Sequence, residues 1–162
     1  YASLLELMHI AEGIDGKVIG VDIDIRSHNR KAIEEHPMSK RIELIQGSSI
    51  DPDIVSQVRD KISPEDRVLV VLDSNHTHSH VLDELKFYAP LVTIGSYCVV
   101  FDTLIEDMPA GSFPNRPWGR GDNPKTAVNE FLASSDEFEL DKDLEAKLLI
   151  TVAPDGFLKR IR

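Results

Sequence analysis

The sequence predicts a doubly wound α/β fold whose sheet is mostly parallel and ends in a C-terminal antiparallel hairpin. Short runs rich in Val, Ile and Leu alternate with segments of helical periodicity over residues 17–102. These runs are nearly continuous in apolar residues rather than strictly alternating, which is typical of parallel strands covered by helices on both faces. A stretch rich in Pro, Gly and Asn, Met108–Pro124, separates this regular part from the rest.

The first half of the chain is predicted to alternate helices and strands. In order, they are a helix over residues 1–11, a strand over Lys17–Ile25, a helix over Asn29–His36, a strand over Arg41–Gln46 and a helix over Asp51–Lys61. Gly13 and Gly16 end the first helix, and Pro37 ends the second. Asp51 is a good N-cap and Pro52 suits the first helical turn, so the third helix has a clear start.

The second half adds the remaining elements. They are a strand over Arg67–Asp73, a helix over Thr77–Tyr88, a strand over Tyr97–Asp102, a loop over Met108–Pro124, a helix over Lys125–Ala133, and a hairpin of Leu148–Val152 with Phe157–Ile161. Val81, Leu82 and Leu85 give the first of these helices an apolar face. Ala153 to Gly156 (APDG) is typical of a four-residue hairpin turn.

Composition limits the classes of protein that fit. With 162 residues, 41% of them hydrophobic, we expect residues 1–162 to form a single domain. Tyr1 already lies in a helical pattern, so we expect the domain to be N-terminally incomplete. No apolar run approaches the ~20 residues of a membrane span, which favours a cytoplasmic protein that does not bind membranes. Cys98, the lone cysteine, lies in an apolar run and is expected to be buried.

The net charge of -10 argues against nucleic-acid binding, because phosphate backbones would be repelled. The expected partner is therefore a small molecule. The sequence leaves the oligomeric state open, a homo-oligomer included.

Small or acidic residues follow every predicted strand of the parallel part. They are Asp22 and Asp24, then Gly47, Ser48 and Ser49, then Asp73 and Ser74, then Asp102 and Thr103. In open parallel sheets, ligands bind at the carboxyl ends of the strands, so these residues are expected at one site.

Asp22 is the residue we expect to accept hydrogen bonds from a ribose, with Asp24, which points to the same side, as its competitor. The short side chains of Gly47, Ser48 and Ser49 suit the edge of a purine ring. A plain strand-to-helix turn explains these three residues equally well.

Asp73 and Asp102 end strands that we expect to be neighbours. Two carboxylates side by side repel each other unless a proton or a cation lies between them. A site of oxygen ligands favours Mg²⁺, Mn²⁺ or Ca²⁺ over zinc.

Histidines follow Asp73 at alternate positions, at His76, His78 and His80. On a helix, residues two apart point about 200° apart, so the three cannot share one ion. A zinc ion shared by His76 and His80, at i and i+4, remains an alternative. We expect His78 and His80 to be solvated residues of the first helical turn. His76 lies next to the strand end, where a neutral imidazole can take a proton from a substrate hydroxyl.

Six runs of the sequence resemble the cephalosporin hydroxylase / rhamnosyl O-methyltransferase family. They are KVIGVDIDIRSHNRKAIEEHP, IELIQGSSID, VLVVLDSNHTHSHVLDELKFYAPLV, SYCVVFDT, NPKTAVNEFL and KLLITVAPDGFLKR. The resemblance covers most of the chain, and LDSNHTH and VAPDGFLKR are its more specific parts. It implies a Rossmann-like class I methyltransferase fold that binds S-adenosylmethionine (SAM).

The resemblance also implies an activity and its residues. The expected activity is a metal-assisted, SAM-dependent O-methyltransferase acting on a hydroxyl of a small molecule or sugar, with Mg²⁺ as the expected ion. Asp73 and Asp102 match two metal ligands of the family, and His76 matches the catalytic base of catechol O-methyltransferase. The expected cofactor contacts are Asp22, Ile23, Gly47, Ser48, Ser49, Asp73 and Ser74.

Two features depart from the family pattern. Family members usually carry Glu-Asp where this chain has Phe101 and Asp102, so one metal ligand is lost. The glycine-rich turn that binds the methionine part of the cofactor would precede Tyr1.

The loop that carries Phe113, Arg116, Trp118 and Arg120 is expected either to cover the acceptor or to be a surface loop with one packed Trp. Two rival functions remain. One is a non-catalytic α/β module with a degraded cofactor site. The other is a NAD-dependent oxidoreductase, which shares the fold but needs hydride-transfer residues that the sequence does not display.

Overall fold

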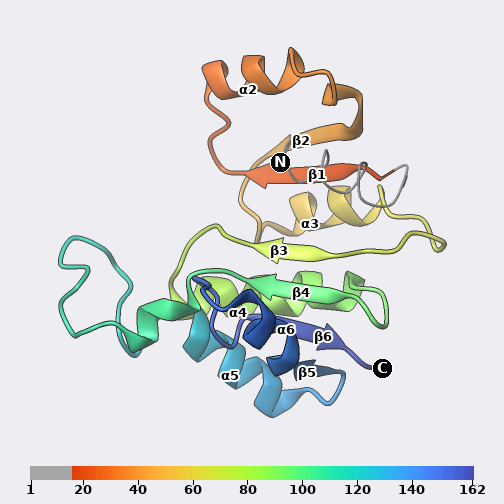
Figure 1. Cartoon of the computed structure of the whole chain (residues 1–162). Helices are drawn as coiled ribbons and strands as arrows, with labels where there is room; N and C mark the ends of the chain where they lie inside the picture. Colours follow the sequence, from red (N-terminus) through yellow and green to blue (C-terminus); the bar gives the residue numbers. More distant parts are fainter. Residues whose placement is uncertain (1–15) are drawn as a thin grey trace. The chain divides into compact units, whose positions relative to one another are not determined.

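The structure is a computed structural model that describes residues 16–162 (Figure 1). The chain divides into two compact units, Tyr1–Asp60 and Lys61–Arg162. The helix expected over residues 1–11 lies outside the described residues. None of the helices within residues 16–162 has the length and apolar character that crossing a membrane requires.

The described part of the first unit is a parallel strand pair with its connecting helices. Its elements are β1 (Val18–Asp22), α2 (Ser27–Glu34), η1 (Ser39–Arg41), β2 (Ile42–Gln46) and α3 (Pro52–Arg59). The last pair of the ladder joins Asp22 to Gln46. As predicted, the Asp51 side chain caps α3 by accepting the Asp53 N–H at 2.9 Å, and Pro52 occupies the first turn. The strands and helices expected here are confirmed, with a shorter first strand.

The second unit contains a mixed sheet in the order β3-β4-β6-β5. Its strands are β3 (Val70–Leu72), β4 (Tyr97–Val100), β5 (Phe138–Leu140) and β6 (Phe157–Arg160), and its helical segments are α4 (His78–Tyr88), η2 (Ala89–Leu91), η3 (Thr103–Asp107), α5 (Pro124–Ser134) and α6 (Lys142–Leu148). β3 and β4 are parallel, whereas β6 runs antiparallel to both β4 and β5. α4 and α5 pack against each other.

The predicted hairpin of Leu148–Val152 with Phe157–Ile161 is wrong in its first strand. β6 pairs with β4 on one side and with β5 on the other, so both of its hydrogen-bonding edges are occupied. Residues 148–152 therefore have no free edge to join, and α6 extends to Leu148 instead. The antiparallel C-terminal pair exists, but its other strand is Phe138–Leu140, in the acidic segment.

The core of the second unit lies around α4, β4 and β6. Its most deeply buried members, each at most 1% exposed, include Leu85, Val92, Cys98, Val100, Val128 and Leu158. Cys98 is buried as predicted, and burial raises the pKa of its thiol to about 12. A thiol in this state is a packing group, because the reactive thiolate is not formed near neutral pH.

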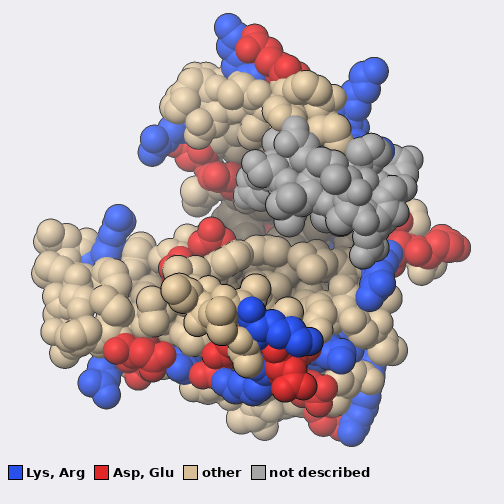
Figure 2. All heavy atoms as spheres, in the orientation of Figure 1, with Lys and Arg blue, Asp and Glu red and all other residues tan. Residues whose placement is uncertain are grey.

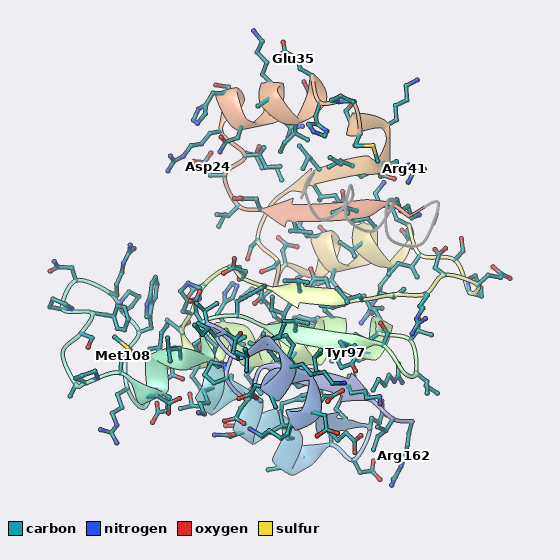
Figure 3. The ribbon with its side chains drawn as sticks, in the orientation of Figure 1. Asp24, Glu35, Arg41, Tyr97, Met108 and Arg162 are labelled. Atoms are coloured by element: carbon teal, nitrogen blue, oxygen red, sulfur yellow. The ribbon has the colours of Figure 1, made fainter. Side chains whose placement is uncertain are left out.

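Acidic and basic side chains are mixed on the face shown in Figure 2. Several charged side chains of the second unit form ion pairs. Lys125 contacts Asp107 at 2.9 Å and Asp155 at 3.0 Å, and Asp155 also pairs with Lys142. On β4, the Tyr97 hydroxyl donates to Asp141, the N-cap of α6, at 2.6 Å (Figure 3). These contacts connect the C-terminal segments to the sheet.

The start of α5 is held by Asn123, which is fully buried. Its side-chain oxygen accepts the backbone N–H groups of Lys125 at 3.0 Å and Thr126 at 3.3 Å. In return, the Thr126 hydroxyl accepts the Asn123 backbone N–H at 3.2 Å. Its amide nitrogen donates to Gly119 O at 2.8 Å and to Glu106 Oε2 at 2.5 Å. One side chain therefore caps a helix and closes the preceding loop.

Replacement of Asn123 by Ala should reduce the free energy of unfolding by about 1 to 2 kcal/mol, because a helix cap is lost and the buried amide that pairs with the Glu106 carboxylate is removed. Urea unfolding curves measure the change. Asn129→Ala, on the exposed side of the same helix, is the matched control and should stay within about 0.5 kcal/mol of the parent. Equal midpoints for both variants would refute the role given to Asn123.

Candidate active site

The carboxyl ends of β3 and β4 lie side by side because the two strands pair in parallel. Leu72 is opposite Val100, and the Phe101 N–H donates to Leu72 O at 3.0 Å, which continues the pairing past the last strand residues. Asp73 follows β3 directly, and Asp102 lies two residues past the end of β4. The prediction that these two aspartates end neighbouring strands is therefore confirmed.

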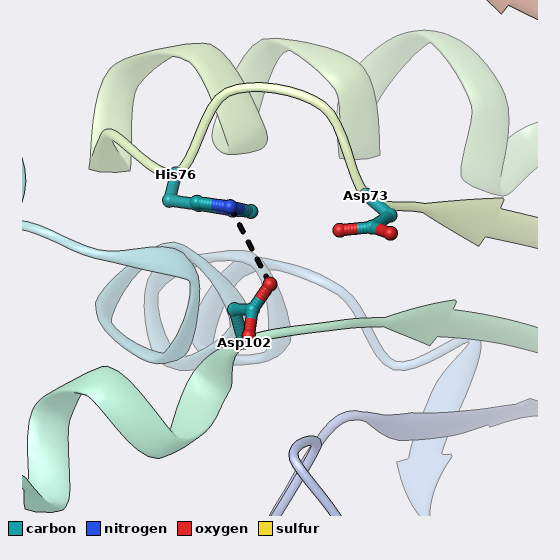
Figure 4. A group of neighbouring side chains, drawn as sticks. All are labelled: Asp73, His76 and Asp102. Carbon is teal, nitrogen blue, oxygen red and sulfur yellow. Dashed lines mark ion pairs between the residues drawn. The ribbon is translucent and has the colours of Figure 1, made fainter.

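Asp73, His76 and Asp102 form one cluster at this edge (Figure 4). Each offers a ligand atom, and these atoms all lie within 4.8 Å of one another. His76 Nε2 is 3.4 Å from Asp102 Oδ2, and the imidazole side chain is 19% exposed. The two carboxylates are thus close enough to share a cation, and the histidine faces the strand edge rather than the core.

The turn at Asp102 has an unusual backbone conformation. Its φ of 57° and ψ of 22° lie in the left-handed region, which Asp tolerates better than most residues. Next to it, Thr103 is fully buried and donates its hydroxyl to Pro154 O at 2.6 Å. The buried threonine therefore anchors a turn that directs the Asp102 carboxylate toward Asp73.

The electrostatics of the cluster favour a positive charge. Partial withdrawal from water is the largest cause that raises the pKa of Asp73, and the neighbouring Asp102 carboxylate raises it further. His76 acts in the opposite direction. A proton, an imidazolium or a divalent cation between the carboxylates would relieve the repulsion.

The turn between β3 and α4 holds His76 in place through two side chains. Asn75 Oδ1 accepts the Thr77 N–H at 2.9 Å, which forms a local turn around His76. The Ser74 hydroxyl donates to Glu84 Oε1 at 2.7 Å. This turn is therefore bonded to the helix that follows it.

Glu84 is a residue that the sequence analysis missed. It is only 2% exposed, and its Oε2 has no hydrogen-bond partner among the described residues. Its position on α4 was the available signal, because it shares the apolar face with Val81, Leu85 and Tyr88 at helical spacing. A carboxylate on such a face requires a local partner, which Ser74 provides.

The expectation that His78 and His80 are solvated is wrong. His78 Nδ1 lies 2.8 Å from Thr126 Oγ1, and its Nε2 lies 3.1 Å from Glu130 Oε2. Both partners belong to α5, so His78 joins two helices. His80 Nε2 lies 3.6 Å from Glu84 Oε1.

These positions contradict a zinc ion shared by His76 and His80. α4 begins at His78, so the i, i+4 spacing of a continuous helix does not apply to His76. The two imidazoles also face different carboxylates, Asp102 and Glu84.

Trp118 brings the long loop onto the cluster. Its ring lies 4.9 Å from the His76 ring, at an interplanar angle of 87°, and Arg116 lies over the indole at 5.2 Å. Of the four loop residues singled out in the sequence, Trp118 is thus the one that touches the cluster directly. Phe113 is partly buried elsewhere in the loop, and the positive charge of Arg120 acts on Glu106.

Glu106 fixes the C-terminal end of this loop. Its Oε2 accepts the Gly121 N–H at 2.7 Å in addition to the amide of Asn123. These two donors, the Gly121 N–H first, hold the pKa of Glu106 below its usual value of 4.5. Asp122 Oδ1 accepts the His78 N–H at 2.6 Å, so the loop is also tied to the start of α4.

The predicted cofactor contacts are divided between the two units. In the first unit, Asp22 and Gly47 lie together, because the Gly47 N–H donates to Asp22 O at 2.9 Å. Asp22 Oδ1 also accepts the Asp24 N–H at 2.9 Å, and both aspartates line a cavity of about 230 Å³ beside α2. Ile23 directly follows Asp22 in the chain, and Ser48 and Ser49 directly follow Gly47. Asp73 and Ser74 belong to the second unit.

Gly47 has a packing role of its own. A Cβ at this position would lie 2.5 Å from Ile54 Cδ1, in the buried face of α3. The requirement for glycine is therefore explained without a ligand, and the purine-binding role of this turn stays a prediction.

Because the folded-state pKa of Glu106 is lowered, its contribution to loop stability is complete above its usual pKa of 4.5 and is lost as the pH falls below it. The emission of Trp118, the chain's only tryptophan, should stay constant from neutral pH to about pH 4.5 and shift to longer wavelength below it. Glu106→Gln should show a shifted emission already at neutral pH.

Glu139→Gln, an exposed change on β5, is the control and should leave the emission as in the parent chain. An emission profile of Glu106→Gln that matches the control at every pH would contradict the role of Glu106.

A Rossmann-like α/β sheet with this cluster at the carboxyl edge of two parallel strands belongs to the methyltransferase class of folds. The family model described as Rhamnosyl O-methyltransferase/CmcI matches residues 1–161. The chain belongs to this family.

Curated relatives carry the same description. The chain is 34% identical over 152 residues to a rhamnosyl O-methyltransferase of Mycobacterium tuberculosis (strain ATCC 25618 / H37Rv), covering 89% of this chain and 56% of that protein. It is 32% identical over 155 residues to the Mycobacterium leprae (strain TN) protein, covering 95% and 62%. The chain therefore spans little more than half the length of these relatives.

Solved structures share the fold. The MycE methyltransferase from the mycinamycin biosynthetic pathway, in complex with Mg, SAH and mycinamycin VI, matches with a TM-score of 0.54 and 20% identity, over 91% of this chain and 37% of that one. A second MycE structure, with Mg and SAH, gives a TM-score of 0.53 at 21% identity.

Proposed function

We propose that residues 1–162 are part of a SAM-dependent O-methyltransferase domain that methylates a hydroxyl of a sugar or another small molecule with the help of a divalent cation. The observation that carries this proposal is the convergence of Asp73, His76 and Asp102 at the carboxyl edge of β3 and β4. It is supported by the family, whose relatives are named for rhamnosyl O-methyl transfer, and by the Mg and SAH in the MycE complex.

Asp73 and Asp102 are the proposed cation ligands. Hard oxygen ligands suit Mg²⁺. Burial raises the pKa of Asp73 most, and repulsion by the neighbouring Asp102 carboxylate raises it further; a bound cation would relieve that repulsion. When bound, such a cation polarises a hydroxyl oxygen and favours loss of its proton. Phe101 supplies no oxygen ligand, so the protein would contribute two carboxylates and water would complete the coordination.

His76 is the proposed general base. His76 Nε2 would accept the proton of the acceptor hydroxyl, and SAM, when bound, would supply the methyl group and leave as S-adenosylhomocysteine. Asp102, 3.4 Å from Nε2, stabilises the imidazolium that forms. Trp118 restricts the orientation of the ring by its edge contact and covers it from water.

The proposed cofactor contacts are Asp22, Ile23, Gly47, Ser48, Ser49, Asp73 and Ser74. Asp22 would accept the ribose hydroxyls through the carboxylate oxygen that its Asp24 contact leaves available. Trp118 and Arg116 would then lie on the acceptor side of His76, where an indole face suits the apolar face of a sugar ring.

Asp22→Ala should weaken the binding of S-adenosylhomocysteine to the full-length protein by about 1.5 to 3 kcal/mol, the range of hydrogen bonds to charged groups. Calorimetric titration measures the affinity. Asp53→Ala, an exposed aspartate in the first turn of α3, is the control and should leave affinity unchanged. An unchanged affinity in Asp22→Ala would remove Asp22 from the cofactor site.

His76→Ala should reduce methyl transfer by about 10² to 10⁴, the usual contribution of a positioned base, while S-adenosylhomocysteine affinity stays nearly unchanged. Transfer of labelled methyl to rhamnosyl acceptors and other hydroxyl compounds measures the rate. His28→Ala, an exposed histidine of α2, is the control. His78 is not a suitable control, because its loss would disturb the α4–α5 contact.

A non-catalytic role is the second candidate, and Phe101 is the observation that favours it. If the full-length protein methylates no acceptor with Mg²⁺ and SAM supplied, the non-catalytic role becomes the proposed function in place of methyl transfer.

A further inference from the structure

We propose that His76 lets the site distinguish two classes of divalent cation. A hard cation such as Mg²⁺ binds to Asp73 and Asp102 and leaves the imidazole free as a base. A borderline transition-metal cation such as Zn²⁺ or Co²⁺ takes His76 Nε2 as a third ligand and so blocks proton transfer. The blocking of catalysis rests on the proposed function, whereas the difference in ligands does not.

The spacing of the three ligand atoms suits a tetrahedral cation. Zn²⁺ binds imidazole nitrogen and carboxylate oxygen at about 2.0 to 2.2 Å, so two ligand atoms at a tetrahedral ion lie about 3.4 Å apart. His76 Nε2 and Asp102 Oδ2 are 3.4 Å apart. With the Asp73 oxygen also inside the 4.8 Å limit, a small side-chain rotation completes a three-ligand site.

The two classes of cation prefer different ligands. Mg²⁺ requires oxygen ligands in octahedral geometry and keeps several waters, so it gains little from an imidazole. Nitrogen ligands raise the affinity for Co²⁺ and Zn²⁺ much more. Because Phe101 withholds a third carboxylate, the hard cation has only two protein ligands, and the imidazole gives the transition metal an additional one.

The imidazole of His76 is held at the site. Trp118 packs on it edge to face, and the local turn made by Asn75 and Thr77 fixes the backbone around it. A ring held beside Asp102 is a ready ligand as well as a ready base, and the same nitrogen cannot serve both roles at once.

The test compares metal binding, without any assay of methyl transfer. Metal-free full-length protein is titrated with CoCl₂ and with MgCl₂ by calorimetry, and the visible absorption of bound Co²⁺ is recorded. His76→Ala should lower Co²⁺ affinity at least about tenfold, because loss of even an outer partner of a metal ligand costs about 10- to 100-fold. It should leave Mg²⁺ affinity unchanged within about twofold and alter the Co²⁺ spectrum.

Asp73→Asn should weaken both ions, and the control His28→Ala should weaken neither. His76→Gln keeps a polar side chain of similar length, so it should repeat the result if His76→Ala unfolds. Unchanged Co²⁺ affinity in the His76 variants, equal losses for both ions, or no Co²⁺ binding by the parent protein would each overturn the proposal.

Inhibition of methyl transfer by Zn²⁺ is measured in a separate experiment. In an active enzyme, Zn²⁺ should inhibit methyl transfer, and excess Mg²⁺ should restore it by competition. If no acceptor is methylated but Co²⁺ binding still depends on His76, the proposed function fails and the ligand assignment stands. Zn²⁺ binding through His76 without any inhibition of an active enzyme would overturn the blocking role.

Discussion

The parallel pairing of β3 with β4 is the constraint on which the site depends. The ladder continues past the strand ends through the Phe101 N–H and Leu72 O, so two chain exits carrying Asp73 and Asp102 are forced together. The repulsion between the carboxylates is one reason for the raised pKa of Asp73. Backbone hydrogen bonds and the buried Thr103 maintain this arrangement, and a cation or an imidazolium between the carboxylates would relieve the repulsion.

The parts of the site that the sequence predicts correctly are those that follow from local patterns. Continuous apolar runs identify parallel strands, and parallel strands place their carboxyl ends at one edge. Asp73 and Asp102 could therefore be paired, and His76 placed beside them, from the order of the residues. Asp51 as the cap of α3 is likewise a local signal.

The errors concern contacts between distant residues. β6 was assigned a neighbouring partner because a turn sequence precedes it, but pairing with β4 and β5 fills both of its edges. His78 looked solvated because its partners, Thr126 and Glu130, lie 48 and 52 residues further along the chain. No periodicity in the sequence reports such a contact.

One connected set of contacts couples His76 to the loop that carries Trp118. His78 joins α4 to α5, and Asn123, at the start of α5, binds Glu106. Glu106 in turn holds Gly121, three residues beyond the Trp118 that packs on His76. A change at the α4–α5 contact should therefore affect the orientation of the imidazole, although it lies outside the cluster.

We propose that this chain is part of a SAM-dependent methyltransferase. Calorimetric titration of the full-length protein with S-adenosylhomocysteine, and separately with NAD, in the presence of Mg²⁺, tests it most directly. The account predicts stoichiometric binding of S-adenosylhomocysteine and no binding of NAD. Binding of NAD in its place, or binding of neither ligand, would contradict the account.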